Sequence, residues 1–167
     1  LFDQYAPRFD KVLVNDLDYC GPEVLLKAVL AARHMARLPS HFKRAIDLGC
    51  GTGLLGVEIR DLVVRLEGYD LSRNMLREAE EKHVYDHLAQ ADLSLEDEAS
   101  GLFAEGFSKA RADFVGAADV LMYLGELDPP FRLARALLQP GGLFAFSVED
   151  AGEGDGFVLR ESLRFAH

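Results

Sequence analysis

Cysteine is scarce in this chain, and long apolar runs are absent from it. Only Cys20 and Cys50 occur among 167 residues, and neither belongs to a paired motif. Two such cysteines favour reduced thiols in a cytoplasmic protein over a disulfide framework. No run of about 18 apolar residues occurs, so we expect no membrane-spanning helix, and no signal peptide is visible.

Basic residues are also few. The chain has 18 Lys plus Arg against 28 Asp plus Glu, which gives a formal charge of −10. Nucleic-acid binders usually carry a basic face, and an anionic membrane surface would repel this balance of charge. We therefore expect neither a nucleic-acid partner nor a membrane partner.

Length and composition suit a single domain over residues 1–167. Apolar residues make up 49% and charged residues 28%, the balance of an ordinary globular domain. The chain begins with Leu1 rather than Met, and it stops at His167 without a closing strand or cap. Both ends favour a fragment of a longer protein.

Residues 1–40 are expected to form an N-terminal helical cap. Pro7 and Pro22 can each occupy a first helical position, and Pro39-Ser40 would end the last helix. Apolar residues between positions 25 and 36 recur at helical spacing, which predicts one buried face.

From residue 43 to residue 148, strand and helix patterns alternate. Strands are expected at 44–48, 63–69, 88–91, 112–118 and 143–148, and helices at 55–62 and 73–82, in part of 94–107, and from 128 onward. Ser72 and Asp128 are the expected N-caps of two of these helices. The alternation predicts βαβ units on a parallel sheet, an α/β fold. An acidic loop over 149–156 and a hairpin from 157–159 and 164–166 would follow.

The strongest motif is Asp47-Leu48-Gly49-Cys50-Gly51-Thr52-Gly53, placed between a strand and a helix. Glycines let the backbone turn sharply and approach a ligand without a Cβ in the way. The helix that follows offers unpaired N–H groups. Three alternating glycines exceed what a plain strand–helix turn requires, so we expect a ligand here.

The residues alone are compatible with two kinds of ligand, a dinucleotide and a ligand that carries an ammonium group. Residues 51–56 match the GxGxxG dinucleotide fingerprint, and Asp70 lies 19 residues after Gly51. Against a nicotinamide cofactor, Asp47 places a carboxylate at the turn with no local Lys or Arg, and would repel a pyrophosphate. A ligand that carries an ammonium group would be attracted instead.

The stretch 47–53 resembles motif I of class I S-adenosylmethionine-dependent methyltransferases, which have a Rossmann-like parallel sheet. The resemblance implies cofactor binding by Asp47, Gly49, Cys50, Gly51 and Gly53. Further positions implied by the same resemblance, in chain order, are Asp70 for the ribose hydroxyls, Leu71 and Met75 against adenine, Asp92 and Leu93 near the adenine amino group, and Ala118 beside the methionine part. Pro140-Gly141-Gly142 matches the family's turn before the fifth strand.

A narrower likeness joins residues 1–10 and 117–125 to predicted methyltransferases linked to tetratricopeptide repeats. It implies a repeat domain upstream of this chain. In related enzymes a tyrosine of the N-terminal helices reaches the cofactor carboxylate, which makes Tyr5 and Tyr19 candidates. Simple packing of both aromatic rings between helix and sheet is the alternative.

The implied reaction is methyl transfer to a small-molecule acceptor by in-line displacement. Proximity and orientation supply most of the catalysis, so no catalytic residue is assigned. Asp119 and Tyr123 follow the fourth strand, but we favour structural roles for both. A nicotinamide-dependent oxidoreductase and a non-catalytic cofactor-binding module are the alternatives.

Two tempting motifs are set aside. Asp128-Pro129-Pro130-Phe131 resembles a motif of amino-group nucleic-acid methyltransferases, but it lies about ten residues too far after its strand, so a helix start explains it better. His83 and His87 have a spacing that suits a metal, yet no third ligand is evident, so no metal site is expected.

The resemblance also sharpens the expectation of a fragment. A class I methyltransferase sheet has seven strands, and only five precede the loop at 149–156. We therefore expect the last helix and the last two strands to be missing from this chain, with the cofactor-binding half complete.

Overall fold

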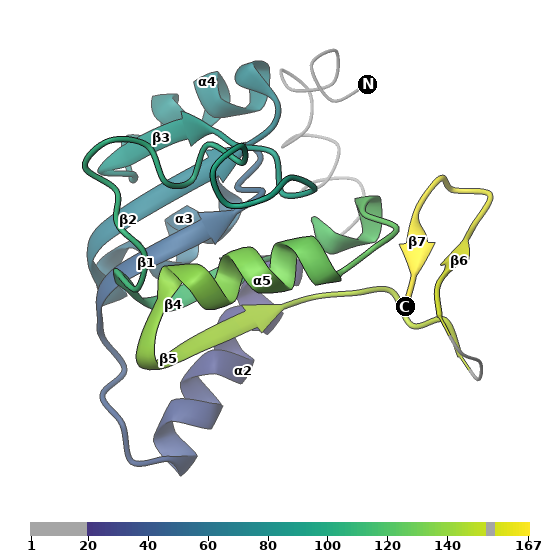
Figure 1. Ribbon diagram of the computed structural model, residues 1–167. Helices are drawn as coiled ribbons and strands as arrows, with labels where there is room; N and C mark the ends of the chain where they lie inside the picture. The colour runs from purple at the N-terminus through teal and green to yellow at the C-terminus, as the bar shows by residue number, and fades with distance from the viewer. Residues whose placement is uncertain (1–19, 153–155) are drawn as a thin grey trace.

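The computed structural model describes residues 20–152 and 156–167, and these residues form the expected α/β fold. Helices and strands alternate along the chain (Figure 1). The helices are α2 (Gly21–Met35), α3 (Leu54–Ile59), α4 (Arg73–Glu81) and α5 (Asp128–Leu137), with 3-10 turns η2 (Arg60–Leu62) and η3 (Leu121–Tyr123). The strands are β1 (Phe42–Leu48), β2 (Val63–Asp70), β3 (His87–Gln90), β4 (Ala112–Ala117), β5 (Leu138–Phe146), β6 (Val158–Leu159) and β7 (Phe165–Ala166).

The main sheet has the strand order β3-β2-β1-β4-β5, and every neighbouring pair in it is parallel. Chain order therefore runs outward from β1 to β3 on one side and continues from β4 to β5 on the other. Ligands of open parallel sheets bind outside the carboxyl ends of the strands at such a reversal. The reversal lies between β1 and β4, beside the glycine turn.

Helices cover both faces of the sheet. Figure 1 shows α5 in front of the strands, with α2 and α3 behind them. Strand residues alternate between two apolar clusters, so Ile46 and Leu48 belong to one and Ala45 to the other. Leu133 and Leu137 of α5 complete the first cluster, whereas Leu25 and Val29 of α2 complete the second.

Several element boundaries differ from the sequence expectation. Helix α2 ends at Met35, before Pro39, because Arg37 adopts a left-handed conformation (φ 55°) that stops the helix. The expected helix within 94–107 is wrong, since this whole stretch is a series of turns. Asp128 is not an N-cap: Leu127 holds that position, and the prolines lie in the first helical turn. Ser72 is confirmed as the N-cap of α4.

The expected hairpin is confirmed, and it contacts the segment after β4. Strands β6 and β7 pair antiparallel, apart from the main sheet (Figure 1). The His167 Nε2 atom lies 3.1 Å from the Leu124 carbonyl oxygen, and the Phe165 ring lies beside Gly125. Within residues 20–152 and 156–167, none of the helices is long and apolar enough to cross a membrane.

Candidate functional site

The turn from β1 into α3 is built on three glycines with positive φ. Gly49, Gly51 and Gly53 have φ values of 66°, 55° and 91°, which residues with a Cβ adopt only at a cost. A Cβ on Gly49 would also lie 2.2 Å from Val120 Cγ2. A Cβ on Gly51 would meet nothing within 4 Å, because this part of the turn faces open space.

Asp70, at the end of β2, ties this turn to the start of α4. Its Oδ2 atom accepts a hydrogen bond from the Gly51 N–H at 2.9 Å, and its Oδ1 atom accepts one from the Ser72 N–H at 2.8 Å. Ser72 in turn caps α4, since its hydroxyl accepts from the Met75 N–H at 3.2 Å. Asp70 is thus held in one orientation between two loops.

A cavity of about 520 Å³ opens at the carboxyl edge of the sheet. The expected site residues that line it are Asp47, Gly49, Cys50, Gly51, Asp70, Leu71, Met75, Asp92, Leu93 and Ala118. Gly53 is not in this wall, because it sits behind the turn at the N-cap of α3. Tyr5 and Tyr19 lie outside the described residues. The tertiary structure thus brings most of the predicted set together.

The wall near Met75 is formed by the segments after β2 and β3. Met75 is buried, whereas Leu71 leaves 61% of its surface exposed. The Asp92 carboxylate accepts from the N–H and the hydroxyl of Ser94, at 2.9 and 2.6 Å, which shapes the turn after β3. This end of the cavity is therefore lined by apolar side chains and by one carboxylate, that of Asp92.

The opposite wall comes from the segment after β4 and from the hairpin, and the sequence pattern missed part of it. Val120, Met122, Leu124 and Arg164 line the cavity there, together with Asp119 and Tyr123. The Arg164 guanidinium lies 5.9 Å from the centre of the Tyr123 ring, and its Nη1 atom is 3.1 Å from a Glu149 oxygen. No local pattern marks Arg164, because only docking of the hairpin brings it here.

Asp119 is held at the same wall by Ser147. The Asp119 N–H donates to the Ser147 hydroxyl oxygen at 2.7 Å, and that hydroxyl donates to Asp119 Oδ1 at 2.6 Å. Asp119 also has a φ of 52°, which is uncommon for a non-glycine residue and clusters at functional sites. Asp119 is thus fixed in place at the border of the cavity, which Tyr123 also lines.

Asp47 is a buried ionisable group of the cavity whose pKa is strongly raised. Only 1% of its surface is exposed, and the Tyr85 hydroxyl donates to its Oδ2 atom at 2.7 Å. Burial raises the pKa of Asp47 to about 7 although the Tyr85 bond opposes the shift, and the charge of Asp70 raises it further. Near neutral pH this carboxyl is thus close to half ionised.

These observations correct the electrostatic argument made from the sequence. The expectation that no Lys or Arg lies at the turn is wrong, since Lys82 Nζ donates to the Thr52 carbonyl at 2.7 Å. A half-ionised Asp47 also repels a pyrophosphate less than a full charge would. Lys82 is not part of the cavity wall. Charge at the turn alone does not decide between the two cofactor classes.

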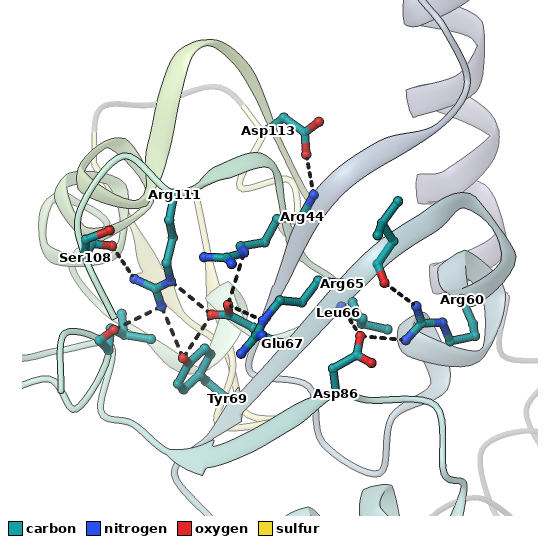
Figure 2. A network of polar contacts seen from close by, with 12 residues as sticks. Arg44, Arg60, Arg65, Leu66, Glu67, Tyr69, Asp86, Ser108, Arg111 and Asp113 are labelled. Atoms are coloured by element: carbon teal, nitrogen blue, oxygen red, sulfur yellow. Dashed lines mark hydrogen bonds and ion pairs between the residues drawn. The ribbon is translucent and has the colours of Figure 1, made fainter. Parts of the chain in front are cut away.

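A buried polar network supports the sheet behind the cavity (Figure 2). Glu67 of β2 is fully buried, and its Oε2 atom accepts from Arg111 Nε at 3.0 Å and from the Tyr69 hydroxyl at 3.1 Å. Arg111 also donates to the carbonyls of Ser108 and Leu102, at 2.8 and 3.0 Å. It therefore fastens the turns after Asp92 to β2.

The sequence of this chain matches a known family along most of its length. The Methyltransferase domain family matches residues 24–164. The chain belongs to this family. It carries a methyltransferase domain, and the matched range includes the glycine turn, Asp70 and the hairpin.

Two curated relatives illustrate how far the likeness of this methyltransferase domain extends. A malonyl-[acyl-carrier protein] O-methyltransferase of Enterobacter lignolyticus is 33% identical over 115 residues, which cover 68% of this chain and 42% of the relative. A ubiquinone biosynthesis O-methyltransferase of Methylobacterium nodulans is 26% identical over 152 residues, covering 82% and 59%. The chain spans less than two thirds of the length of either relative.

Solved structures show the same fold as this methyltransferase domain. The DhpI–SAH complex superposes with a TM-score of 0.69 at 20% identity, covering 99% of this chain and 75% of that one. An S-adenosylmethionine-dependent methyltransferase from Clostridium acetobutylicum gives 0.63 at 22% identity, covering 96% and 65%. At such identities the likeness establishes the Rossmann-like fold.

Proposed function

We propose that the protein transfers a methyl group from S-adenosylmethionine to a small-molecule acceptor. Membership of the methyltransferase domain family and the sheet order support this reaction class. The observation that carries the proposal is the Asp70 carboxylate, fixed by Gly51 and Ser72 at the rim of a cavity that the glycine turn also lines.

The cofactor would lie along the carboxyl edge of the sheet. The Asp70 carboxylate would accept hydrogen bonds from the ribose hydroxyls. The adenine would lie between Leu71 and Met75. Asp92 and Leu93 would lie near its amino group. Asp47, Gly49, Cys50, Gly51 and Ala118 would border the methionine part, whose ammonium group suits the carboxylate of Asp47. Gly53 would act by shaping the turn.

The acceptor would enter beside Asp119, Met122 and Tyr123. Methyl transfer from a sulfonium needs an aligned nucleophile about 3 Å from the methyl carbon, so orientation supplies most of the rate. An acceptor that enters protonated also needs a base. Asp119, held by Ser147, is the carboxylate at this wall.

Binding experiments test the cofactor assignment directly. Isothermal titration calorimetry of the full chain should show binding of S-adenosylhomocysteine and no binding of NADH. Binding of NADH alone would favour the oxidoreductase alternative. Cofactor binding without methylation of any acceptor would favour a non-catalytic module.

The first acceptors to test follow from the relatives. Malonyl-acyl carrier protein and intermediates of ubiquinone biosynthesis are named by the curated relatives. Transfer of a labelled methyl group to a ubiquinone intermediate would support a small-molecule acceptor, whereas transfer to malonyl-acyl carrier protein would replace it with an acceptor bound to a carrier protein. A relationship to the methyltransferases linked to tetratricopeptide repeats, and with it an upstream repeat domain, is part of the same proposal and rests on the sequence of residues 1–10 and 117–125.

A further inference from the structure

Tyr85, in the segment between α4 and β3, fills a slot made by three glycines. A Cβ on Gly53, Gly56 or Gly68 would approach its ring to 2.9, 2.3 and 2.7 Å respectively. Gly56 lies inside α3, where glycine is unfavourable, and Gly68 lies inside β2. Gly56 is the last glycine of the GxGxxG match, and in the structure it gives space to the Tyr85 ring.

The slot brings the Tyr85 hydroxyl to Asp47, to which it donates at 2.7 Å. A carboxylate buried to this degree is costly unless it is hydrogen-bonded. Three other ionisable groups lie around Asp47 or its turn. Asp70 and Cys50 line the same cavity, and Lys82 donates to the Thr52 carbonyl on the far side of the turn.

We propose that Tyr85 is a positioning residue of the cofactor site, and that its hydroxyl fixes the orientation and the charge of Asp47 for a ligand ammonium group. The proposal rests on the proposed function as far as the ligand is concerned. The hydroxyl lies in the slot together with the ring, since a Cβ on Gly56 would approach the hydroxyl oxygen to 2.3 Å. A hydroxyl buried there is costly without a hydrogen-bond partner, and Asp47 is an acceptor for it. The hydroxyl is the polar atom of the side chain, and it donates to the carboxylate of Asp47.

The sign of the effect follows from the hydrogen bond. Donation by Tyr85 favours the ionised form of Asp47 and lowers its pKa against the effect of burial. Without the hydroxyl, the pKa of Asp47 rises further. A rise of one unit from about 7 reduces the ionised fraction at pH 7 from about one half to about one tenth. Affinity for an ammonium group should fall by the same factor, about fivefold.

The first test needs no ligand. The ¹³C signal of the Asp47 carboxyl is assigned by its loss in D47N, and its titration is compared between the wild type and Y85F. The midpoint should lie at a higher pH in Y85F. Y69F is the matched control, because it removes another buried hydroxyl that is bonded to Glu67 instead. An unchanged midpoint in Y85F would overturn the proposal.

The second test measures S-adenosylhomocysteine affinity by calorimetry from pH 6 to 8.5. In Y85F the affinity should be about fivefold weaker at pH 7 and should approach the wild-type value toward pH 8.5. A loss of affinity that is equal at every pH would show a purely structural role and contradict the proposal. If the wild type does not bind the ligand, the proposed function fails, and the carboxyl titration still decides whether Tyr85 controls Asp47.

Discussion

Asp70 and Gly51 are joined by a hydrogen bond of 2.9 Å, from the backbone N–H of the glycine turn to a carboxylate oxygen at the end of the neighbouring strand. This bond fixes the geometry of the turn and orients the carboxylate at the same time. The second carboxylate oxygen is held by Ser72, so the group has little freedom to turn away from the cavity.

We expect D70A to weaken S-adenosylhomocysteine binding by tenfold or more. The variant removes the proposed contact with the ligand and releases the Gly51 amide, and hydrogen bonds to a charged group are worth about 1.5–3 kcal/mol each. Calorimetry measures the change. D113A is the matched control, because Asp113 also accepts from two backbone amides, those of Lys43 and Arg44, at the opposite end of β1. Equal losses of affinity in the two variants would contradict a specific role for Asp70.

Asp47 should make the fold less stable as the pH rises. Its pKa is raised from 3.8 to about 7 in the folded chain, so the native state holds this proton more tightly than the unfolded state. The stabilising effect of that proton is present below about pH 4 and is lost as the pH rises through 7. D47N should therefore gain stability over the wild type by up to about 4 kcal/mol between pH 4 and pH 8.

Urea unfolding of D47N at the two pH values measures this gain. The matched control is D61N. Asp61 is exposed on η2, so its carboxylate pays no desolvation cost that the substitution could remove. The same D47N variant should bind S-adenosylhomocysteine more weakly despite its greater stability. A stability difference that does not change with pH would contradict the expectation.

Gly49 and Gly51 should respond differently to alanine. Both have positive φ, so each substitution costs about 1–2 kcal/mol of unfolding free energy from the backbone alone. G49A adds a clash with Val120 at 2.2 Å, whereas G51A meets nothing within 4 Å. G49A should be the less stable of the two in urea, and V120A should restore part of its stability.

The effect on binding distinguishes these glycines further. Gly51 lines the cavity, and a Cβ added to it would project into open space, where it would obstruct a ligand. G51A should therefore lose S-adenosylhomocysteine binding with only a modest loss of stability. Normal binding by G51A would place the ligand elsewhere in the cavity.

The buried Glu67–Arg111 pair should be far more important for stability than an exposed ion pair. Both side chains are almost fully buried, and removal of Arg111 takes away the shortest ion pair of Glu67, at 3.0 Å. The guanidinium groups of Arg44 and Arg65 remain at 3.6 Å and are more exposed. R111M should cost about 3–5 kcal/mol of unfolding free energy. R132A is the control, because the exposed pair of Arg132 with Glu96 should contribute at most about 1 kcal/mol. Similar unfolding midpoints for the two variants would contradict the proposed fastening of the turns at 102–108.

The strand and helix order was predictable because each element carries its own periodicity and punctuation. Ser72 as N-cap and the glycine turn are local signals, and both are confirmed. The expected helix within 94–107 was wrong. Local bonds such as that from the Ala99 N–H to the Glu96 carbonyl form single turns there, and Arg111, which lies outside the stretch, holds the Leu102 carbonyl. Asp128 failed as a cap because the helix begins one residue earlier than its prolines suggest.

The sequence by itself determined the α/β class, the glycine turn and the acidic residues that follow the strands, because spacing and residue type are local properties. Only the tertiary structure decided the pKa of the Asp47 carboxyl, the position of Arg164 in the cavity wall and the reason for a glycine at position 56. Burial determines the pKa of Asp47, and docking of the hairpin places Arg164. The Tyr85 ring, 29 residues after Gly56 in the chain, fills the space that Gly56 leaves. Each depends on residues that are distant in the chain and adjacent in the fold.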